Sequence, residues 1–278
     1  MVKAVIITVN YRGTQDTLRL LENLRGLSGF QDTSLIIVDN ASQDDSFSKI
    51  NEAVGDLINV RCIAAPRNLG YFGAARWALD NYLVDSDLPN WVIVCNNDVV
   101  FPDVGFLNSL LEQPNDVGAI APRIVSARNG YEQNPFMPSR PGRLGVLKIR
   151  FWFSRFGLCR MQAEVSGRLR ALRAVMRKDR KAIRKRRPIY APHGACIIFS
   201  RRFFEQGGYI DNGTFLYGEE IGVAEVAMRL GLSVIFEPSL QVLHNEHRTT
   251  GRRLSRATFG YKRDALQYLL NRYWQDVR

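Results

Sequence analysis

The first 120 residues alternate between runs that are apolar throughout and segments whose apolar residues recur at helical spacing. The apolar runs cover residues 3–9, 34–40, 58–65, 91–95 and 117–122, and the helical segments between them are residues 14–24, 44–54, 71–83 and 104–113. In the first helical segment Leu18, Leu21 and Leu24 fall on one face. Strands that are apolar throughout are buried on both faces, and the helices between them connect parallel neighbours. The pattern predicts an α/β fold with a Rossmann-like, mostly parallel sheet flanked by helices.

Polar residues follow three of these apolar runs at the point where each run ends. The sequences are TVN at residues 8–10, VDN at 38–40 and CNND at 95–98. Sheets of this kind bind ligands beyond the carboxyl ends of their strands. We therefore expect these three ends to line one rim of the sheet.

The charge of the chain is concentrated after Pro122. Residues 123–187 hold nineteen Lys or Arg against three acids, whereas the whole chain of 278 residues has a net charge of +11. The remainder is mildly acidic, so the chain is interpreted as one domain with a basic insert. The expected parts are a nucleotide-binding half (1–122), the insert (123–188) and a catalytic half (189–278). The last part holds a strand at 194–200, a helix at 217–231, two short extended runs around Pro238 and a C-terminal helix at 253–274.

The insert mixes aromatic and basic residues. Phe151, Trp152 and Phe153 lie between Lys148, Arg150 and Arg155, and Val165, Leu169, Leu172 and Met176 follow at helical spacing among further arginines. An apolar stripe with a basic face is typical of a helix at the headgroup boundary of an anionic membrane. The insert, residues 144–187, is therefore expected to contact such a surface. The alternatives are a solvated basic arm, or a stripe buried against the core or a second subunit.

Several classes of protein do not fit the sequence. The four cysteines show no CxxC spacing, and no apolar run approaches the roughly 18–20 residues that span a bilayer. No signal peptide is visible, so we expect a soluble or peripheral protein on the cytoplasmic face of the plasma membrane. The absence of GxGxxG, of a P-loop and of HExxH disfavours dinucleotide, Walker-type ATP and zinc-protease sites.

The polar ends of the runs carry groups with specific chemistry. The carboxylate of Asp39 can accept hydrogen bonds from a base, and Asp98 offers the hard oxygen that Mg²⁺ or Mn²⁺ prefers. Asn68 precedes a helix whose first N–H groups can face a phosphate. Glu220 begins another helix, where a carboxylate in a cleft can act as a general base, and His244 is a candidate metal ligand. For each residue, ordinary turn, cap or structural chemistry is the alternative.

The order of these motifs resembles that of family 2 glycosyltransferases. The resemblance is carried by VNY, VDNAS, NLG, NND, GACIIF, YGEE and H-x-E-H, and it extends over nearly the whole chain apart from the insert. It is greatest for the bacterial rhamnosyltransferase-like branch. It implies a GT-A fold, a nucleotide-sugar donor such as dTDP-rhamnose or a UDP-sugar, inversion at the anomeric carbon, and a saccharide or lipid-linked saccharide acceptor in surface polysaccharide synthesis.

The resemblance also implies roles for single residues. Asp39 corresponds to the acid that recognises the base, and Asp98 and His244 to ligands of a divalent cation, Mg²⁺ or Mn²⁺. Glu220 corresponds to the general base. The remaining nucleotide-binding positions are Val9, Asn10, Asn68, Asn96 and Asn97.

The chain departs from the family pattern at four positions. Asn96 replaces the first acid of the DxD motif, Glu220 stands where Asp is commoner, Gly222 where a further acid is frequent, and Asp264 where Asn is usual. These departures leave open a non-catalytic relative of the same fold. A nucleic-acid-binding protein is the other alternative, from the pI of about 9.8, but the basic residues are confined to one insert and no nucleic-acid partner is expected. A nucleotidyltransferase would need a more glycine-rich loop than NYRGTQDT after the first strand.

Overall fold

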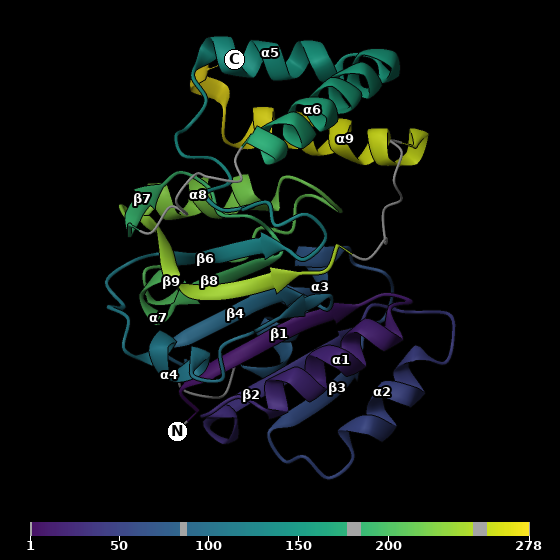
Figure 1. Cartoon of the computed structure of the whole chain (residues 1–278), viewed down its shortest axis with the longest axis vertical. Coiled ribbons are helices and arrows are strands. Elements are labelled where there is room, and N and C mark those ends of the chain that lie inside the picture. Colours follow the sequence, from purple (N-terminus) through teal and green to yellow (C-terminus); the bar gives the residue numbers. More distant parts are fainter. Residues whose placement is uncertain (1, 84–87, 177–184, 247–254, 278) are drawn as a thin grey trace.

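The computed structural model describes residues 2–83, 88–176, 185–246 and 255–277, with the backbone alone at 167–176 (Figure 1). Its centre is one sheet in the order β3-β2-β1-β4-β8-β6-β9-β5, with β7 beside β9. The strands are β1 (Ala4–Asn10), β2 (Thr33–Asp39), β3 (Val60–Ala64), β4 (Trp91–Asn96), β5 (Val99–Val100), β6 (Ala119–Ser126), β7 (Arg187–Ile189), β8 (Cys196–Ser200) and β9 (Val234–His244). β3, β2, β1 and β4 are parallel, as are β6 and β9, and β8 runs antiparallel between β4 and β6. The expected mostly parallel α/β sheet is confirmed.

Helices cover both faces of the sheet because successive strand residues point to opposite sides. Ile6 packs with α1 (Thr14–Arg25), α2 (Ser46–Val54) and α4 (Phe106–Leu111) on one face. Its neighbour Ile7 packs on the other face with α3 (Tyr71–Tyr82), α7 (Arg201–Glu205), α8 (Glu219–Arg229) and α9 (Arg256–Arg272). Residues 253 and 254, expected in the last helix, lie outside the described residues. The two apolar layers fix the sheet and leave the strand ends at the rim free for polar groups.

The basic insert is helical, as the sequence indicates, and its helical part is divided into two helices. α5 (Arg143–Phe153) and α6 (Phe156–Met176) lie against α9 at one end of the molecule (Figure 1). Val146 of α5 is fully buried and belongs to the core cluster on the α8 side. β6 continues to Ser126 and so includes the first four residues of the expected insert, 123–126.

The predicted interruption of the strand at Pro238 is wrong. The two extended runs predicted around Pro238 form a single strand, β9, of 11 residues. Its pairing with β6 shifts so that Pro122 lies opposite Glu237 and Arg123 opposite Gln241. Because proline has no N–H to donate, the strand accommodates Pro238 by this irregularity and then resumes its ladder.

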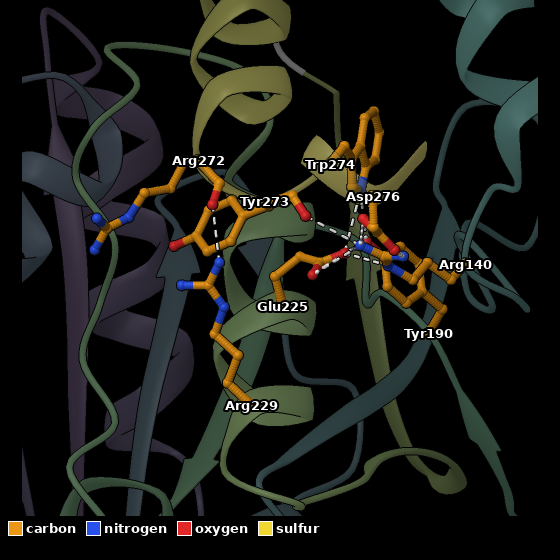
Figure 2. A network of polar contacts seen from close by, with 8 residues as sticks. All are labelled: Arg140, Tyr190, Glu225, Arg229, Arg272, Tyr273, Trp274 and Asp276. Carbon is orange, nitrogen blue, oxygen red and sulfur yellow. Dashed lines mark hydrogen bonds and ion pairs between the residues drawn. The ribbon is translucent and has the colours of Figure 1, made fainter. Parts of the chain in front are cut away.

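A polar network joins the insert and the C-terminus to α8 (Figure 2). Arg140 Nε lies 2.7 Å from Glu225 Oε1 on α8, and Arg140 Nη1 lies 2.6 Å from Asp276 Oδ2. The Glu225 carboxylate also accepts hydrogen bonds from Tyr190 Oη at 2.6 Å and Trp274 Nε1 at 3.1 Å. Glu225 is 1% exposed, so its charge is compensated by these donors and not by water. The network fixes the helix whose first turn carries Glu219 and Glu220.

Candidate functional site

The carboxyl ends of β1, β2 and β4 meet at one rim, as the sequence predicts. In the parallel register Asn10 pairs with Asp39, and Val9 lies between Val38 and Asn96. Four expected nucleotide-binding residues, Val9, Asn10, Asp39 and Asn96, are therefore neighbours. Register, and not proximity in the chain, brings them together.

The Asp39 carboxylate has a fixed orientation at this rim. It is 2% exposed, with Oδ1 accepting a hydrogen bond from Asn10 Nδ2 at 2.8 Å and Oδ2 from the Ser42 N–H at 3.0 Å. Each carboxylate oxygen can accept more than one hydrogen bond, so acceptor capacity is left. The arrangement holds an acceptor suited to the N–H edge of a base.

Two of the expected nucleotide-binding amides hold the backbone. The side-chain oxygen Oδ1 of Asn68 accepts hydrogen bonds from Asn40 Nδ2 at 3.1 Å and from the Gly70 N–H at 3.0 Å, so it closes the turn before α3. Asn97 Nδ2 donates to the Gly13 carbonyl at 3.2 Å and to Thr17 Oγ1 at 2.9 Å, which fastens the start of α1. Asn40, which sequence reasoning missed, also accepts from the Leu69 N–H at 2.8 Å and is 3% exposed.

Asp98, which directly precedes β5, lies beside His244, the last residue of the neighbouring strand β9. His244 Nε2 lies 3.3 Å from Asp98 Oδ1, and both residues are buried. His244 Nδ1 is 2.8 Å from Gln133 Oε1, an atom that only accepts, so Nδ1 carries a proton. Gln133 is itself oriented because its Nε2 donates to Glu246 Oε1 at 2.7 Å. The Nε2 atom of His244 is thus directed toward the carboxylate of Asp98.

The pair of Asp98 and His244 suits a divalent cation whose other ligands are supplied by a substrate and by water. No group of three or more His, Cys, Asp or Glu suited to a metal occurs in the described parts of the chain. Mg²⁺ and Mn²⁺ are commonly held by one or two protein groups together with phosphate oxygens and water. Asp98 and His244 would supply the protein groups, and Asn96 Nδ2, 3.5 Å from His244 Nε2, lies at the same edge.

Glu219 and Glu220 begin α8, directly after Gly218. Glu220 Oε1 accepts a hydrogen bond from the Gly194 N–H at 3.3 Å. Burial raises the pKa of Glu220, while backbone N–H donors and the charge of Lys262 act in the opposite direction. Burial, followed by the charge of Glu220, raises the pKa of Glu219 to about 8. The two acids are therefore electrostatically unequal: both accept hydrogen bonds from backbone N–H groups, but the charge of Lys262 favours the carboxylate of Glu220, whereas the charge of Glu220 disfavours that of Glu219.

The segment before β8, residues 193 and 194, connects Glu220 with the pair of His244 and Asp98. The His193 ring lies 5.9 Å from the His244 ring and 5.6 Å from that of Phe136, measured between centroids. Burial and the nearby His244 lower the pKa of His193 to about 3, so the ring is neutral. The next residue, Gly194, binds Glu220 and accepts a hydrogen bond from Tyr71 Oη at 3.2 Å. The base candidate and the metal candidates are thus joined through two consecutive residues. Gly194 begins the motif GACIIF, but the sequence indicates no role for either residue.

The sequence profile described as "Glycosyl transferase family 2" matches residues 4–208. The chain belongs to glycosyltransferase family 2. Two curated relatives agree with this assignment. The N-acetylglucosaminyl-diphospho-decaprenol L-rhamnosyltransferase of Mycobacterium tuberculosis is 27% identical over 259 residues, which is 89% of this chain and 77% of the relative. The low-salt glycan biosynthesis hexosyltransferase Agl10 of Haloferax volcanii is 26% identical over 243 residues, 87% of this chain and 66% of the relative.

Solved structures confirm the fold of this family 2 glycosyltransferase. GalNAc-T7, crystallised with UDP, GalNAc and Mn²⁺, matches with a TM-score of 0.65 at 13% identity, and the match covers all of this chain and 49% of that one. The mannosyltransferase PcManGT of Pyrobaculum calidifontis, solved with GDP-Man and Mn²⁺, has a TM-score of 0.53 at 14% identity and covers 96% of this chain and 69% of that one. The expected GT-A fold and the expected rhamnosyltransferase-like resemblance are both confirmed.

One departure of this glycosyltransferase from its family has a steric explanation. A Cβ added at Gly222 would lie 3.3 Å from Asp211 Cβ and 3.5 Å from its Oδ2. Asp211 is 7% exposed and accepts hydrogen bonds from Tyr268 Oη at 2.8 Å and from Tyr273 Oη. An acid at position 222 would meet this buried carboxylate, and like charges at that distance oppose each other. Asp211 therefore occupies the space that an acidic side chain at position 222 would need.

Proposed function

We propose that this family 2 glycosyltransferase moves a hexose from a nucleotide-diphosphate donor to a lipid-linked saccharide, with inversion at the anomeric carbon. The observation that carries the proposal is the link from Glu220 through Gly194 and His193 to His244 and Asp98. Glu220 lies on one side of this short segment and the pair of His244 and Asp98 on the other, which supports their proposed roles as general base and cation ligands. The printed name of the mycobacterial relative, whose acceptor is an N-acetylglucosaminyl-diphospho-decaprenol, supports the lipid-linked class of acceptor.

The proposed reaction is a single displacement. Glu220 takes the proton of an acceptor hydroxyl as its oxygen forms a bond to the anomeric carbon of the donor. The bond from that carbon to the diphosphate breaks, and the nucleoside diphosphate leaves with the electron pair. Asp39 holds the base of the donor, which is a dTDP- or UDP-sugar in this proposal. A divalent cation, Mg²⁺ or Mn²⁺, would offset the charge of the diphosphate when bound by Asp98 and His244.

The outer face of α5 supports a membrane location for the acceptor. Leu144, Leu147 and Phe151 are spaced along one face and are 83%, 49% and 57% exposed. The same helix carries three exposed cations, Arg143, Lys148 and Arg150, and a fourth, Arg155, follows its C-terminal end. Exposed apolar residues flanked by cations favour an anionic leaflet, and each basic residue contributes on the order of 1 kcal/mol there.

The neighbouring helix extends the same surface. Met161 and Val165 of α6 are 48% and 50% exposed. The side chains of Leu169, Leu172 and Met176, expected on the same stripe, lie outside the described residues, as do residues 177–184. None of the described helices is long and apolar enough to cross a bilayer. We propose that the enzyme binds peripherally to the cytoplasmic leaflet through the outer faces of α5 and α6.

Calorimetry with UDP, dTDP and GDP, each with and without Mn²⁺, tests the donor site. We expect one of the three to bind, and a panel of its sugar derivatives then identifies the donor by hydrolysis and by transfer to a synthetic N-acetylglucosaminyl-diphospho-lipid. Absence of binding by all three nucleotides at millimolar concentration would refute the proposed function.

A further inference from the structure

An exposed pair of aromatic rings is formed between the loop that precedes α8 and helix α9. Phe215, in the loop before α8, and Tyr261, on α9, have ring centroids 5.1 Å apart and an interplanar angle of 33°. The two residues are 39% and 40% exposed. Rings that serve only to fill the core are buried, so the burial of apolar surface does not account for this pair.

The backbone of Phe215 is fixed against the nucleotide side of the site. Its carbonyl oxygen accepts a hydrogen bond from the Tyr71 N–H at 3.3 Å. A Cβ at Gly70 would lie only 2.1 Å from that oxygen, so the turn before α3 approaches Phe215 as closely as a glycine permits. The backbone of Phe215 is therefore held against the turn before α3.

The other side of the pair is close to the acids of α8. Two residues after Phe215, the Tyr217 N–H donates to Glu219 Oε1 at 3.0 Å. One residue after Tyr261, the Nζ atom of Lys262 lies 4.8 Å from the centre of the Tyr217 ring, and its charge acts on Glu220. The aromatic pair thus lies between the start of α3 and the first turn of α8.

We propose that Phe215 and Tyr261 are the acceptor platform, on which the saccharide to be glycosylated stacks with its reactive hydroxyl toward Glu220. The face of an aromatic ring is electron-rich and attracts the polarised C–H groups of a pyranose, and binding sites combine such apolar surface with a few polar groups. The inference rests on the proposed function, because it assigns the acceptor side of the same reaction.

The position of the acceptor platform agrees with a lipid-linked acceptor. Two residues before Tyr261 on α9, the Phe259 ring contacts the Phe156 ring at the start of α6, with centroids 5.7 Å apart. The same helix therefore carries one ring of the platform and a contact with the helices whose outer faces are exposed and apolar (Figure 1). A saccharide attached to a membrane lipid would reach Glu220 along α9.

Leucine and aromatic substitutions separate stacking from packing. Phe215→Leu and Tyr261→Leu keep an apolar side chain but remove the π face, whereas Phe215→Tyr and Tyr261→Phe keep it. Tyr82→Leu is the matched control, because Tyr82 is 36% exposed and pairs with Trp77 at 5.9 Å, at the opposite end of α3 from the rim. The probe is N-acetylglucosaminyl-diphospho-citronellol, and its affinity is measured by calorimetry beside those of dTDP and UDP.

We expect each leucine variant to weaken binding of the probe about 5- to 10-fold, with nucleotide affinity and melting temperature unchanged. The aromatic variants and Tyr82→Leu should bind the probe as the wild type does. Wild-type affinity for the probe in both leucine variants would overturn the platform, while normal nucleotide binding would still uphold the proposed function. A wild-type enzyme that binds nucleotide but not the probe would also overturn the platform and leave the proposed function in place. A parallel loss of melting temperature and nucleotide affinity would show a packing role instead. Failure of the wild type to bind any nucleotide would refute the proposed function itself.

Discussion

The absence of a side chain at Gly194 leaves the space that the Glu220 carboxylate occupies. A Cβ at position 194 would lie 2.9 Å from Glu220 Oε1, the same atom that accepts the Gly194 N–H at 3.3 Å. Contacts under 3.0 Å are not tolerated without a shift, so an alanine here must displace the carboxylate. The base candidate is thus positioned by the backbone of another element and not by α8 alone.

Glu220→Gln should abolish transfer and keep nucleotide binding, because the amide retains the shape and the hydrogen bond but cannot take a proton. A general base contributes roughly 10²–10⁴-fold to the chemical step. Gly194→Ala should lower kcat as well, with a smaller effect on the KM of the donor. Steady-state transfer kinetics and calorimetry with the nucleotide measure both effects. Near-normal turnover of Glu220→Gln would move the assignment to Glu219.

A second prediction concerns the cation-binding pair. Asp98→Ala and His244→Ala should each reduce the gain in nucleotide affinity that Mn²⁺ produces, with little change when Mn²⁺ is absent. Gln133→Leu should reduce the same gain by about 10- to 100-fold, because the Nδ1 proton of His244 loses its acceptor and the ring its orientation. Calorimetry of the nucleotide with and without Mn²⁺ gives the ratio. An equal loss in both conditions, together with a lower melting temperature, would assign His244 a structural role.

Glu219 provides a prediction on pH. Its pKa is raised to about 8 by burial and by Glu220, so the folded state holds a proton that the unfolded chain releases near its ordinary pKa of 4.5. The stabilising contribution of the protonated acid is complete below pH 4.5 and is lost as the pH rises toward 8. Glu219→Gln, which keeps an acceptor for the Tyr217 N–H, should therefore melt higher than the wild type at pH 8 and similarly at pH 4.5. The expected gain at pH 8 is at least about 1 kcal/mol, or about 2–4 °C. An equal difference at both pH values would contradict the raised pKa.

The rim was predictable from sequence, because parallel strands of similar length end together. Asn10, Asp39 and Asn96 each follow an apolar run, and the register of β1 with β2 and β4 then makes them neighbours. The family resemblance implies a nucleotide-binding role for Asn97. Its amide donates to the start of α1, a contact that could not be predicted because a polar side chain pairs with whichever backbone groups lie nearest.

Other features could not be predicted, because they depend on contacts between distant parts of the chain. Pro238 locally indicates a break, yet pairing with β6 on both sides of the irregularity keeps β9 continuous. Arg140 and Glu225 are 85 residues apart, and neither has a spacing or motif that relates it to the other. The same holds for Phe215 and Tyr261, whose rings meet only after α9 has packed on the sheet.

The Arg140–Glu225 ion pair yields a prediction on stability. Arg140→Met should lower the free energy of unfolding by about 2–4 kcal/mol, because the carboxylate of Glu225 remains buried without its cation (Figure 2). The matched control is Arg160→Met. Arg160 pairs with Glu164 at 3.0 Å, but both side chains are more than half exposed, and such pairs contribute about 0–1 kcal/mol. Denaturant titrations of the two variants provide the comparison. Equal losses would show that the network does not hold the insert and α8 together.

The last prediction concerns the membrane. A deletion of residues 123–187 would also remove Arg140 and the end of β6, so substitutions on the outer face of α5 are the cleaner change. In flotation with vesicles that contain anionic lipid, the wild type should bind, and binding should fall at high salt because the interaction of cations with the surface is screened. Replacing Leu144, Leu147 and Phe151 by Gln should remove binding at any salt concentration, whereas replacing Lys148 and Arg150 by Gln should weaken it mainly at low salt. Substitution of Ile58, which is fully exposed on the other half of the molecule, is the control and should have no effect. Equal binding to neutral vesicles would remove the electrostatic part of the proposal, and no binding to either vesicle would leave the outer face of α5 to a protein partner.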